Sequence, residues 1–175
     1  STETRTRVIE AFGRAPLHFE PNRGQAAEPV KFLARTPGYQ LLLTPAEAVL
    51  ALHGRGATPP AAVRMQLVGE GVNRTPTVEA LEALPAHSNY YLGNDPQRWQ
   101  TDVPHFAKVR YSQVYPGVDW VLYGNPRQLE YDFVVAPGVD PAQIAVRFAG
   151  ADALRVEANG ELVVSVAGRT VLHSS

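Results

Sequence analysis

Cysteine is absent from this chain of 175 residues, which excludes disulfides, thiolate catalysis and cysteine-ligated metal sites. Lysine is almost absent, because only Lys31 and Lys108 among the 16 basic residues are lysines. The net charge is −1 and the arginines are scattered, so the chain lacks the clustered positive field that a nucleic-acid partner needs. No apolar run approaches the ~18 residues of a membrane span, and no basic-then-apolar signal segment is present. We therefore expect a mature or trimmed form that does not insert into a membrane.

The sequence motifs of the common enzyme classes are also missing. There is no G-x-S-x-G elbow, H-E-x-x-H pair, P-loop or G-x-G-x-x-G fingerprint, and the five histidines lack the spacing of a metal site. His87, Ser88, Asp102 and His105 contain the letters of a catalytic triad, but no strained nucleophile turn accompanies them. We interpret these four as surface loop residues and predict that the protein is not an enzyme.

Short alternating segments and turn residues make up most of the chain. Gly (14) and Pro (15) are spread throughout, and Asn159-Gly160 is a strong signal for a two-residue hairpin. Short helical turns are expected near 94–99 and 139–143, where Asp precedes Pro. The pattern predicts strands at 30–35, 39–44, 46–53, 62–68, 77–84, 105–111, 118–124 and 127–136, with a C-terminal meander over 154–173.

This succession of strands without alternating helices predicts an all-β fold. We expect an antiparallel β-sandwich-like domain with short helical turns, and a closed barrel is the alternative. Residues 1–16 are polar and irregular, so they are expected to be a flexible N-terminal arm. Residues 17–175 form the single domain, with a loop or boundary between sub-layers near 54–62.

Glu130 and Asp132 are two carboxylates on one face of a predicted strand. If the hairpin closes at 124–126, Asp119 and Tyr123 share that face. We interpret the face as the solvated side of an antiparallel sheet. Two alternatives remain: a calcium site made by Asp119, Glu130 and Asp132, and the carboxylate pair of a glycoside hydrolase, for which a flat strand offers no cleft.

Exposed aromatic and polar residues are the candidates for ligand binding. Trp120 is expected in the core, whereas Trp99 lies next to a turn and is expected to be exposed. The turn in FEPNRGQ (19–25) is either a binding loop or a cap on the edge of the sandwich, and the cap is favoured. The candidate ligand-binding residues are Trp99, Tyr115, Tyr123, Asn22 and Gln25. Lys31 and Lys108 are the candidates for an isopeptide bond, although a surface lysine is the favoured interpretation.

Several segments, in this order along the chain, carry a resemblance to one family. They are LHFEPNRGQ (17–25), VKFLARTPGYQLLLTPAEAVLAL (30–52), NYYLGNDPQRWQTDVPHFAKVRYSQVYPGVDWVLYGN (89–125), RQLEYDFVVAPGVDP (127–141) and FAGADALRVEANGELVV (148–164). The chain resembles the N-terminal domain of unknown function that precedes SBBP repeats, which are predicted β-propeller repeats, in large exported bacterial proteins. The resemblance implies an extracellular or cell-surface location and assigns no activity, ligand or catalytic residue.

These observations together favour a non-catalytic structural or adhesive module of an exported bacterial protein. Its expected partners are other protein domains or copies of itself, because unpaired strand edges offer a route to association. The alternative is a carbohydrate-binding module, with calcium as the one cofactor considered. A glycoside hydrolase is the third interpretation.

Overall fold

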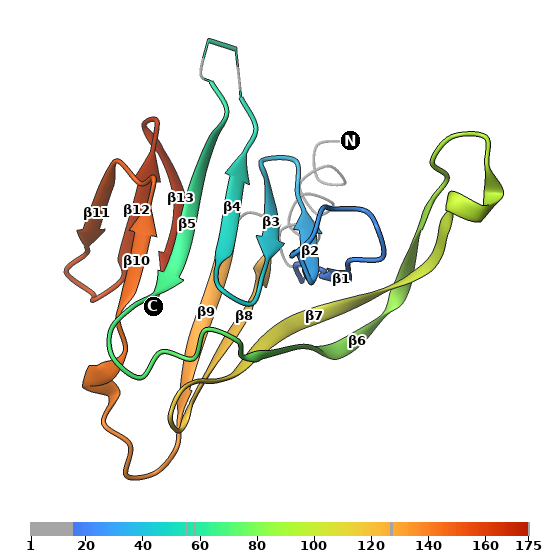
Figure 1. The fold of residues 1–175 in the computed structure, drawn as a ribbon. Helices are drawn as coiled ribbons and strands as arrows, with labels where there is room; N and C mark the ends of the chain where they lie inside the picture. Colours follow the sequence, from blue (N-terminus) through green and yellow to red (C-terminus); the bar gives the residue numbers. More distant parts are fainter. Residues whose placement is uncertain (1–15, 55, 58, 127, 175) are drawn as a thin grey trace, which may run out of the picture.

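The protein folds into antiparallel sheets that pack against each other, as predicted (Figure 1). The computed structural model describes residues 16–54, 56–57, 59–126 and 128–174. The expected flexible arm over 1–16 therefore lies outside the described residues, apart from Pro16. A six-stranded sheet has the order β1 (Glu20–Pro21), β2 (Phe32–Arg35), β3 (Tyr39–Leu43), β4 (Ala48–Leu52), β5 (Ala61–Leu67) and β10 (Val146–Ala149).

Two further sheets complete the fold. A four-stranded sheet has the order β6 (Thr77–Tyr90), β7 (Gln100–Tyr115), β8 (Val118–Asn125) and β9 (Gln128–Val135). A three-stranded sheet contains β11 (Ala153–Val156), β12 (Leu162–Val166) and β13 (Arg169–Ser174). The two short helical turns form where expected, as η1 (Pro96–Arg98) and η2 (Pro141–Gln143), each begun by an Asp side chain that accepts a backbone N–H bond.

One apolar core joins these sheets. Strands β3 and β4 alternate buried and half-buried residues, so their apolar sides face the core. Buried side chains such as Leu41 and Met65 from the six-stranded sheet belong to the same cluster as Trp120 from β8. Tyr111 also spans the two layers, since its hydroxyl donates to the carbonyl of Thr44 at 2.8 Å. This arrangement is sandwich-like, and the loop from 53 to 60 joins two neighbouring strands of one sheet.

The hairpin of β6 and β7 is much longer than the sequence pattern indicated. Strands were expected at 77–84 and 105–111, but the pairing continues to Tyr90 and Gln100. Register shifts near Leu84/His87 and Ser88/Tyr90 accommodate Pro85, because a bulge tolerates a residue without an N–H. Strand β8 pairs with β7 only from Val109 onward, so the rest of the hairpin continues beyond β8, and its end projects from the body (Figure 1). We call residues 81–108 the hairpin arm.

A short N-terminal segment connects the two larger sheets at the base of this arm. The Leu17 amide donates to the Gly124 carbonyl at 2.7 Å, and Phe19 exchanges two backbone hydrogen bonds with Phe106 of β7. The next residues, Glu20 and Pro21, pair with β2 in the other sheet. Residues 17–21 therefore belong to both layers and bring their side chains against the arm.

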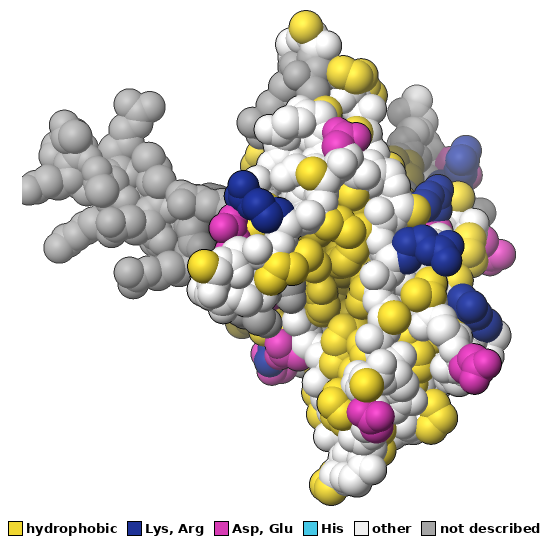
Figure 2. Space-filling view, turned by 90° about the vertical axis from the view of Figure 1, so that its left-hand side faces the viewer, with side chains coloured by type: hydrophobic (Ala, Val, Ile, Leu, Met, Phe, Trp, Pro, Cys, Tyr) yellow, Lys and Arg dark blue, Asp and Glu magenta, His cyan; other side chains and the backbone are white. Residues whose placement is uncertain are grey.

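The side of the molecule away from the arm has a different surface. Strands β10 and β11 lie there, at the left of Figure 1. Figure 2 shows hydrophobic side chains gathered in a hollow along the middle of this face, with charged side chains on both rims. Leu154 and Val156 of β11 are 54% and 68% exposed. We call these two residues the β11 apolar patch.

Candidate functional site

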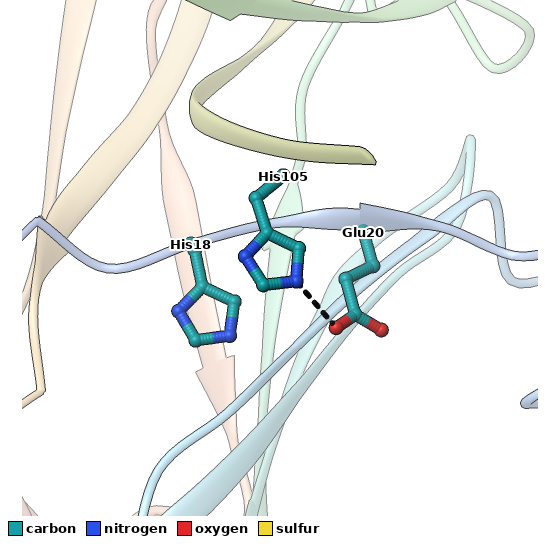
Figure 3. Close-up of side chains that lie close together, drawn as sticks. All are labelled: His18, Glu20 and His105. Carbon is teal, nitrogen blue, oxygen red and sulfur yellow. Dashed lines mark ion pairs between the residues drawn. The ribbon is translucent and has the colours of Figure 1, made fainter. Parts of the chain in front are cut away.

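Three ligand-type side chains meet at the base of the hairpin arm. Extended backbone points the side chain of Phe19 into the core, where it is 0% exposed, and turns His18 and Glu20 to the other side. His105 of β7 lies next to Phe106, the cross-strand partner of Phe19, so its side chain meets Glu20 (Figure 3). We call His18, Glu20 and His105 the His-Glu-His cluster.

The geometry of this cluster is compact and largely closed to solvent. The His105 Nε2 and Glu20 Oε1 atoms are 3.1 Å apart, and their side chains are only 9% and 5% exposed. The His18 ring stacks on the His105 ring with centroids 4.2 Å apart and planes 12° from parallel. One ligating atom from each of the three residues lies within 4.8 Å of the others.

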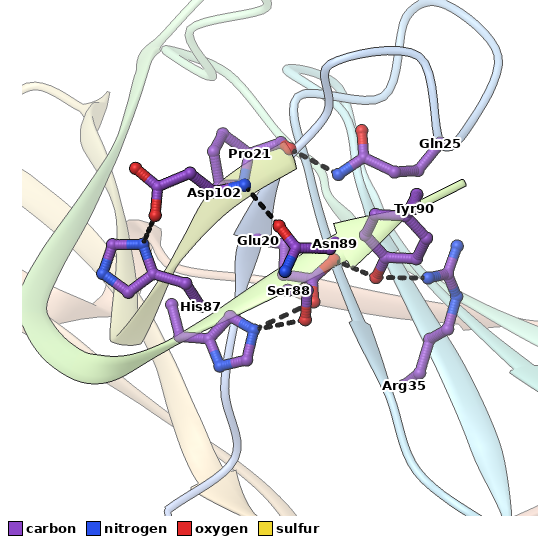
Figure 4. A network of polar contacts seen from close by, with 10 residues as sticks. Glu20, Pro21, Gln25, Arg35, His87, Ser88, Asn89, Tyr90 and Asp102 are labelled. Atoms are coloured by element: carbon purple, nitrogen blue, oxygen red, sulfur yellow. Dashed lines mark hydrogen bonds and ion pairs between the residues drawn. The ribbon is translucent and has the colours of Figure 1, made fainter. Parts of the chain in front are cut away.

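A shell of polar residues surrounds the cluster (Figure 4). Ser88 Oγ of β6 lies 2.7 Å from His105 Nε2. The Tyr90 hydroxyl donates to Glu20 Oε2 at 2.5 Å and accepts a hydrogen bond from Arg35 Nη1 at 2.8 Å. Both β6 and β2 therefore contribute to holding the Glu20 carboxylate in place.

Burial sets the protonation of two members of this network. Burial, with a smaller contribution from neighbouring His105, lowers the pKa of His18 below its usual 6.5, while Glu20 opposes that shift. Burial is also the main cause that raises the pKa of Tyr90, and the Glu20 carboxylate adds to it. His18 is therefore neutral at neutral pH with an available lone pair, and Tyr90 remains a hydrogen-bond donor.

The arrangement of Ser88, His105 and Glu20 differs from a catalytic triad. In a triad, the serine and the carboxylate contact opposite nitrogens of the imidazole, so that the carboxylate fixes the tautomer. Here both Ser88 Oγ and Glu20 Oε1 face the same nitrogen, Nε2 of His105. The other residues named in the sequence, His87 and Asp102, form a separate ion pair at 2.8 Å. These four residues lie on the strands β6 and β7, so the loop part of the interpretation was wrong. The surface part holds for His87 and Asp102, which are exposed, but not for His105, which is buried.

The outer acidic face of β8 and β9, composed of Asp119, Glu130 and Asp132, forms as the hairpin register predicted. Tyr123 lies opposite Glu130, and Asp119 lies opposite Val134 on the same side. The calcium site that was considered as an alternative does not come together there: among the described residues, the one group of three metal-ligating side chains is the His-Glu-His cluster. The physical reason is internal bonding, because Asp119 accepts from the Gln113 amide at 2.7 Å and Asp132 from the Tyr123 hydroxyl at 3.2 Å.

The predicted aromatic candidates have different surroundings. Trp120 is in the core and Trp99 is 36% exposed, as expected. Trp99 meets Tyr91 edge to face with ring centroids 5.1 Å apart and donates to the Gly93 carbonyl at 3.0 Å. Tyr115 was wrongly proposed as a ligand-binding residue, since it is fully buried and its hydroxyl donates to the Val68 carbonyl. Tyr123 lies under the Lys108 ammonium, 5.5 Å from its ring centroid.

The polar residues of FEPNRGQ hold their own loop together. Asn22 Nδ2 donates to the carbonyls of Ala26 and Val30 at 2.8 and 2.9 Å, and its Oδ1 accepts from two backbone amides. Gln25 Nε2 donates to the Pro21 carbonyl at 3.1 Å. These contacts support the capping interpretation of Asn22 and Gln25, because a side chain with its bonds made internally has little left for a ligand.

The two lysines considered for an isopeptide bond are both accessible. Lys31 is exposed, and Lys108 forms an ion pair with Glu82 at 2.9 Å. An isopeptide bond needs a buried lysine beside an Asn or Asp side chain, so the surface interpretation fits both positions.

Sequence reasoning missed the His-Glu-His cluster because its members are far apart in the chain. The search for metal spacing considered histidines close in sequence, whereas His18 and His105 come from separate segments. A usable signal did exist: His18-Phe19-Glu20 and His105-Phe106 each place a polar residue beside a large apolar one. When Phe19 and Phe106 pair across two neighbouring strands, the adjacent polar residues of both strands lie on the opposite face.

The fold and the polar network define an all-β, antiparallel, sandwich-like domain with a projecting hairpin arm. The chain belongs to the family described as "Domain of unknown function (DUF7948)", whose model matches residues 19–175. Neither the search of curated proteins nor that of solved structures returned a match. Within the part of the chain that the structure describes, no helix is long and apolar enough to cross a membrane.

Proposed function

We propose that this domain is a non-catalytic structural and adhesive module that associates with copies of itself through the tip of the hairpin arm. The observation that carries the proposal is the apolar tip. Tyr91, Leu92 and Trp99 are 63%, 50% and 36% exposed at the far end of the projecting hairpin. Aromatic side chains held on a rigid element are the usual anchors of protein contacts.

The β11 apolar patch is the complementary surface in this proposal. Strand β11, which carries this patch, lies on the side of the body opposite the arm (Figure 1). Contact between the tip of one copy and the patch side of the next is a head-to-tail interface, which generates rings or open filaments. Assembly of this kind suits a module that builds or spaces a larger protein.

The exported, extracellular setting of the proposal rests on the resemblance to the domain that precedes SBBP repeats. The non-catalytic part is supported by Ser88 and Glu20 facing one nitrogen of His105, which is not the geometry of a proton relay.

A complementation experiment tests the association. The double variant Tyr91→Ser/Trp99→Ser changes the tip, and Leu154→Ser/Val156→Ser changes the β11 apolar patch. Sedimentation should show concentration-dependent assembly of the intact chain and a loss of about tenfold or more in affinity for each variant alone. An equimolar mixture of the two variants should form dimers that grow no further, because each contributes one intact surface.

The matched control is Val134→Thr, which removes an exposed apolar side chain that belongs to neither surface, 56% exposed on β9. This variant should assemble like the intact chain. A chain that stays monomeric at every concentration, or a tip variant that assembles like the control, would contradict the proposal.

Glycan binding at the same tip is a second candidate, favoured by the exposed Trp99 ring with Tyr91 at its edge. Aromatic faces of this kind stack on apolar faces of ligands. Quenching of tryptophan fluorescence by members of a glycan panel would support glycan binding, provided that Trp99→Phe abolishes the quenching. Trp99→Ala should also lose retention on immobilised glycan. A silent panel would remove it.

A further inference from the structure

The His-Glu-His cluster brings several electron-pair donors to one place. His105 Nε2 has Glu20 Oε1 at 3.1 Å and Ser88 Oγ at 2.7 Å. If Nε2 carries a proton, that single proton must serve two acceptors. If Nε2 is unprotonated, it accepts from Ser88 but its lone pair then faces the Glu20 carboxylate. A cation among these atoms would satisfy all of them at once.

His18 supplies the second, independent observation. Its ring stacks on His105, and within the described ranges its nitrogens make no hydrogen bond. Figure 3 shows that each of the two rings turns a nitrogen toward the side where the Glu20 carboxylate lies. A half-buried imidazole that faces the cluster and makes no hydrogen bond among the described residues can offer a ring nitrogen to an ion.

We propose that His18, Glu20 and His105 bind one transition-metal dication of the zinc class, with Ser88 Oγ next to the fourth position. Imidazole and carboxylate are ligands that suit zinc, at typical bond lengths of about 2.0–2.2 Å. Two ligands of one tetrahedral ion with such bonds are about 3.3 Å apart, close to the 3.1 Å between His105 Nε2 and Glu20 Oε1. His18 needs a shift of about an ångström to join them, which a ring at the edge of the cluster can make.

The surrounding residues have the character of an outer coordination shell. A metal-bound carboxylate is usually oriented by hydrogen bonds to its other oxygen. Tyr90 donates to Glu20 Oε2 and is itself held by Arg35, so Oε1 remains directed at the cluster. These contacts would let Glu20 bind the ion through one oxygen without rearrangement.

The position of the site gives the ion a mechanical role. Residues 17–21 link the two larger sheets, and β7 forms half of the hairpin arm. An ion shared by His18, Glu20 and His105 would fasten this linking segment to the base of the arm. This inference does not depend on self-association, because none of His18, Glu20 and His105 belongs to the connection between β6 and β7 that carries Tyr91 and Trp99.

The test uses the full chain after removal of metals with a chelator. Equilibrium dialysis against zinc, followed by elemental analysis, should give one equivalent of bound zinc. Zinc at about 100 times its Kd should raise the Tm by about 5–10 °C for a domain of this size. Cobalt should substitute for zinc and give the visible absorption of a low-coordinate site with imidazole ligands.

The informative variant is His18→Gln, because the His18 side chain makes no hydrogen bond to any residue that the structure describes, and the variant should therefore fold. It should lose at least tenfold in zinc affinity and the Tm rise, while its far-UV circular dichroism remains unchanged. Glu20→Gln should lose zinc as well. The matched control, His53→Gln, removes an exposed histidine after β4 and should retain one equivalent.

Two results would overturn the proposal. In one, the intact chain binds no zinc and shows no Tm change, and the cluster is then a hydrogen-bonded junction only. In the other, His18→Gln binds zinc as tightly as the intact chain, and the ion then lies elsewhere.

Discussion

Two polar clusters of this molecule are built on the same local pattern and have opposite surroundings. In the His-Glu-His cluster, His18 and Glu20 flank Phe19, and Tyr90 donates to the carboxylate at 2.5 Å. In the outer acidic face, Glu130 and Asp132 flank Tyr131, and Tyr123 donates to Asp132 at 3.2 Å. The difference lies in what covers them: the Glu20 side chain is 5% exposed, whereas Asp132 is open to solvent.

The comparison teaches that strand alternation alone does not make a site. Alternation places both polar pairs on one side of a strand, but only His18 and Glu20 meet further ligand-type side chains from other strands. Burial then strengthens each contact, because hydrogen bonds and ion pairs are less screened away from water. The same residues on an open face would be a solvated surface.

The largest expected difference between the clusters comes from their central aromatic residues. Phe19→Ala empties a position that is fully buried and joins the two sheets, so it should lower the free energy of unfolding by about 3–5 kcal/mol. Tyr131→Ala, at a half-buried position, should cost less. Urea unfolding of both variants measures the difference, and equal losses would break the comparison.

The second difference concerns the two tyrosine hydroxyls. Tyr90→Phe removes a donor from the buried Glu20 carboxylate, which should cost about 1–3 kcal/mol of unfolding free energy. Tyr123→Phe should stay within about 0.5 kcal/mol of the intact chain, because water can replace the hydroxyl at Asp132. If both substitutions have the same small effect, the buried network does not stabilise the fold more than the exposed one.

The smallest expected effect is a difference in pH dependence. The pKa of His18 is lowered in the folded state, so the unfolded chain binds the proton more readily. The stability due to neutral His18 is complete above its unfolded pKa of about 6.5 and is lost as the pH falls from there through the folded pKa. His18→Gln should therefore lose less stability than the intact chain between about pH 7 and pH 5. The urea midpoint of each chain is measured across this pH range without added metal. Equal changes of the midpoint with pH in the two chains would contradict this expectation.

Much of the fold could be predicted from the sequence, because the alternation of apolar and polar residues and the turn residues between segments specify most of its strands. Alternation in segments such as 39–44 and 118–124, with turns such as Asn159-Gly160, predicted the antiparallel strands and the solvated outer face of β8 and β9. The length of the hairpin arm was missed because Pro85 and Pro104 interrupt the pattern, and bulges that tolerate them leave no periodic signal.

The sequence by itself determined the all-β class, the core position of Trp120, the exposure of Trp99 and the faces of regular strands such as β3, β4 and β8. These properties follow from a period of two and from the burial of apolar side chains. Only the tertiary structure decided that His18 and Glu20 meet His105 and that Tyr115 is sealed in the core. The physical reason is that such contacts depend on which strands become neighbours, and the packing of the whole chain settles that choice.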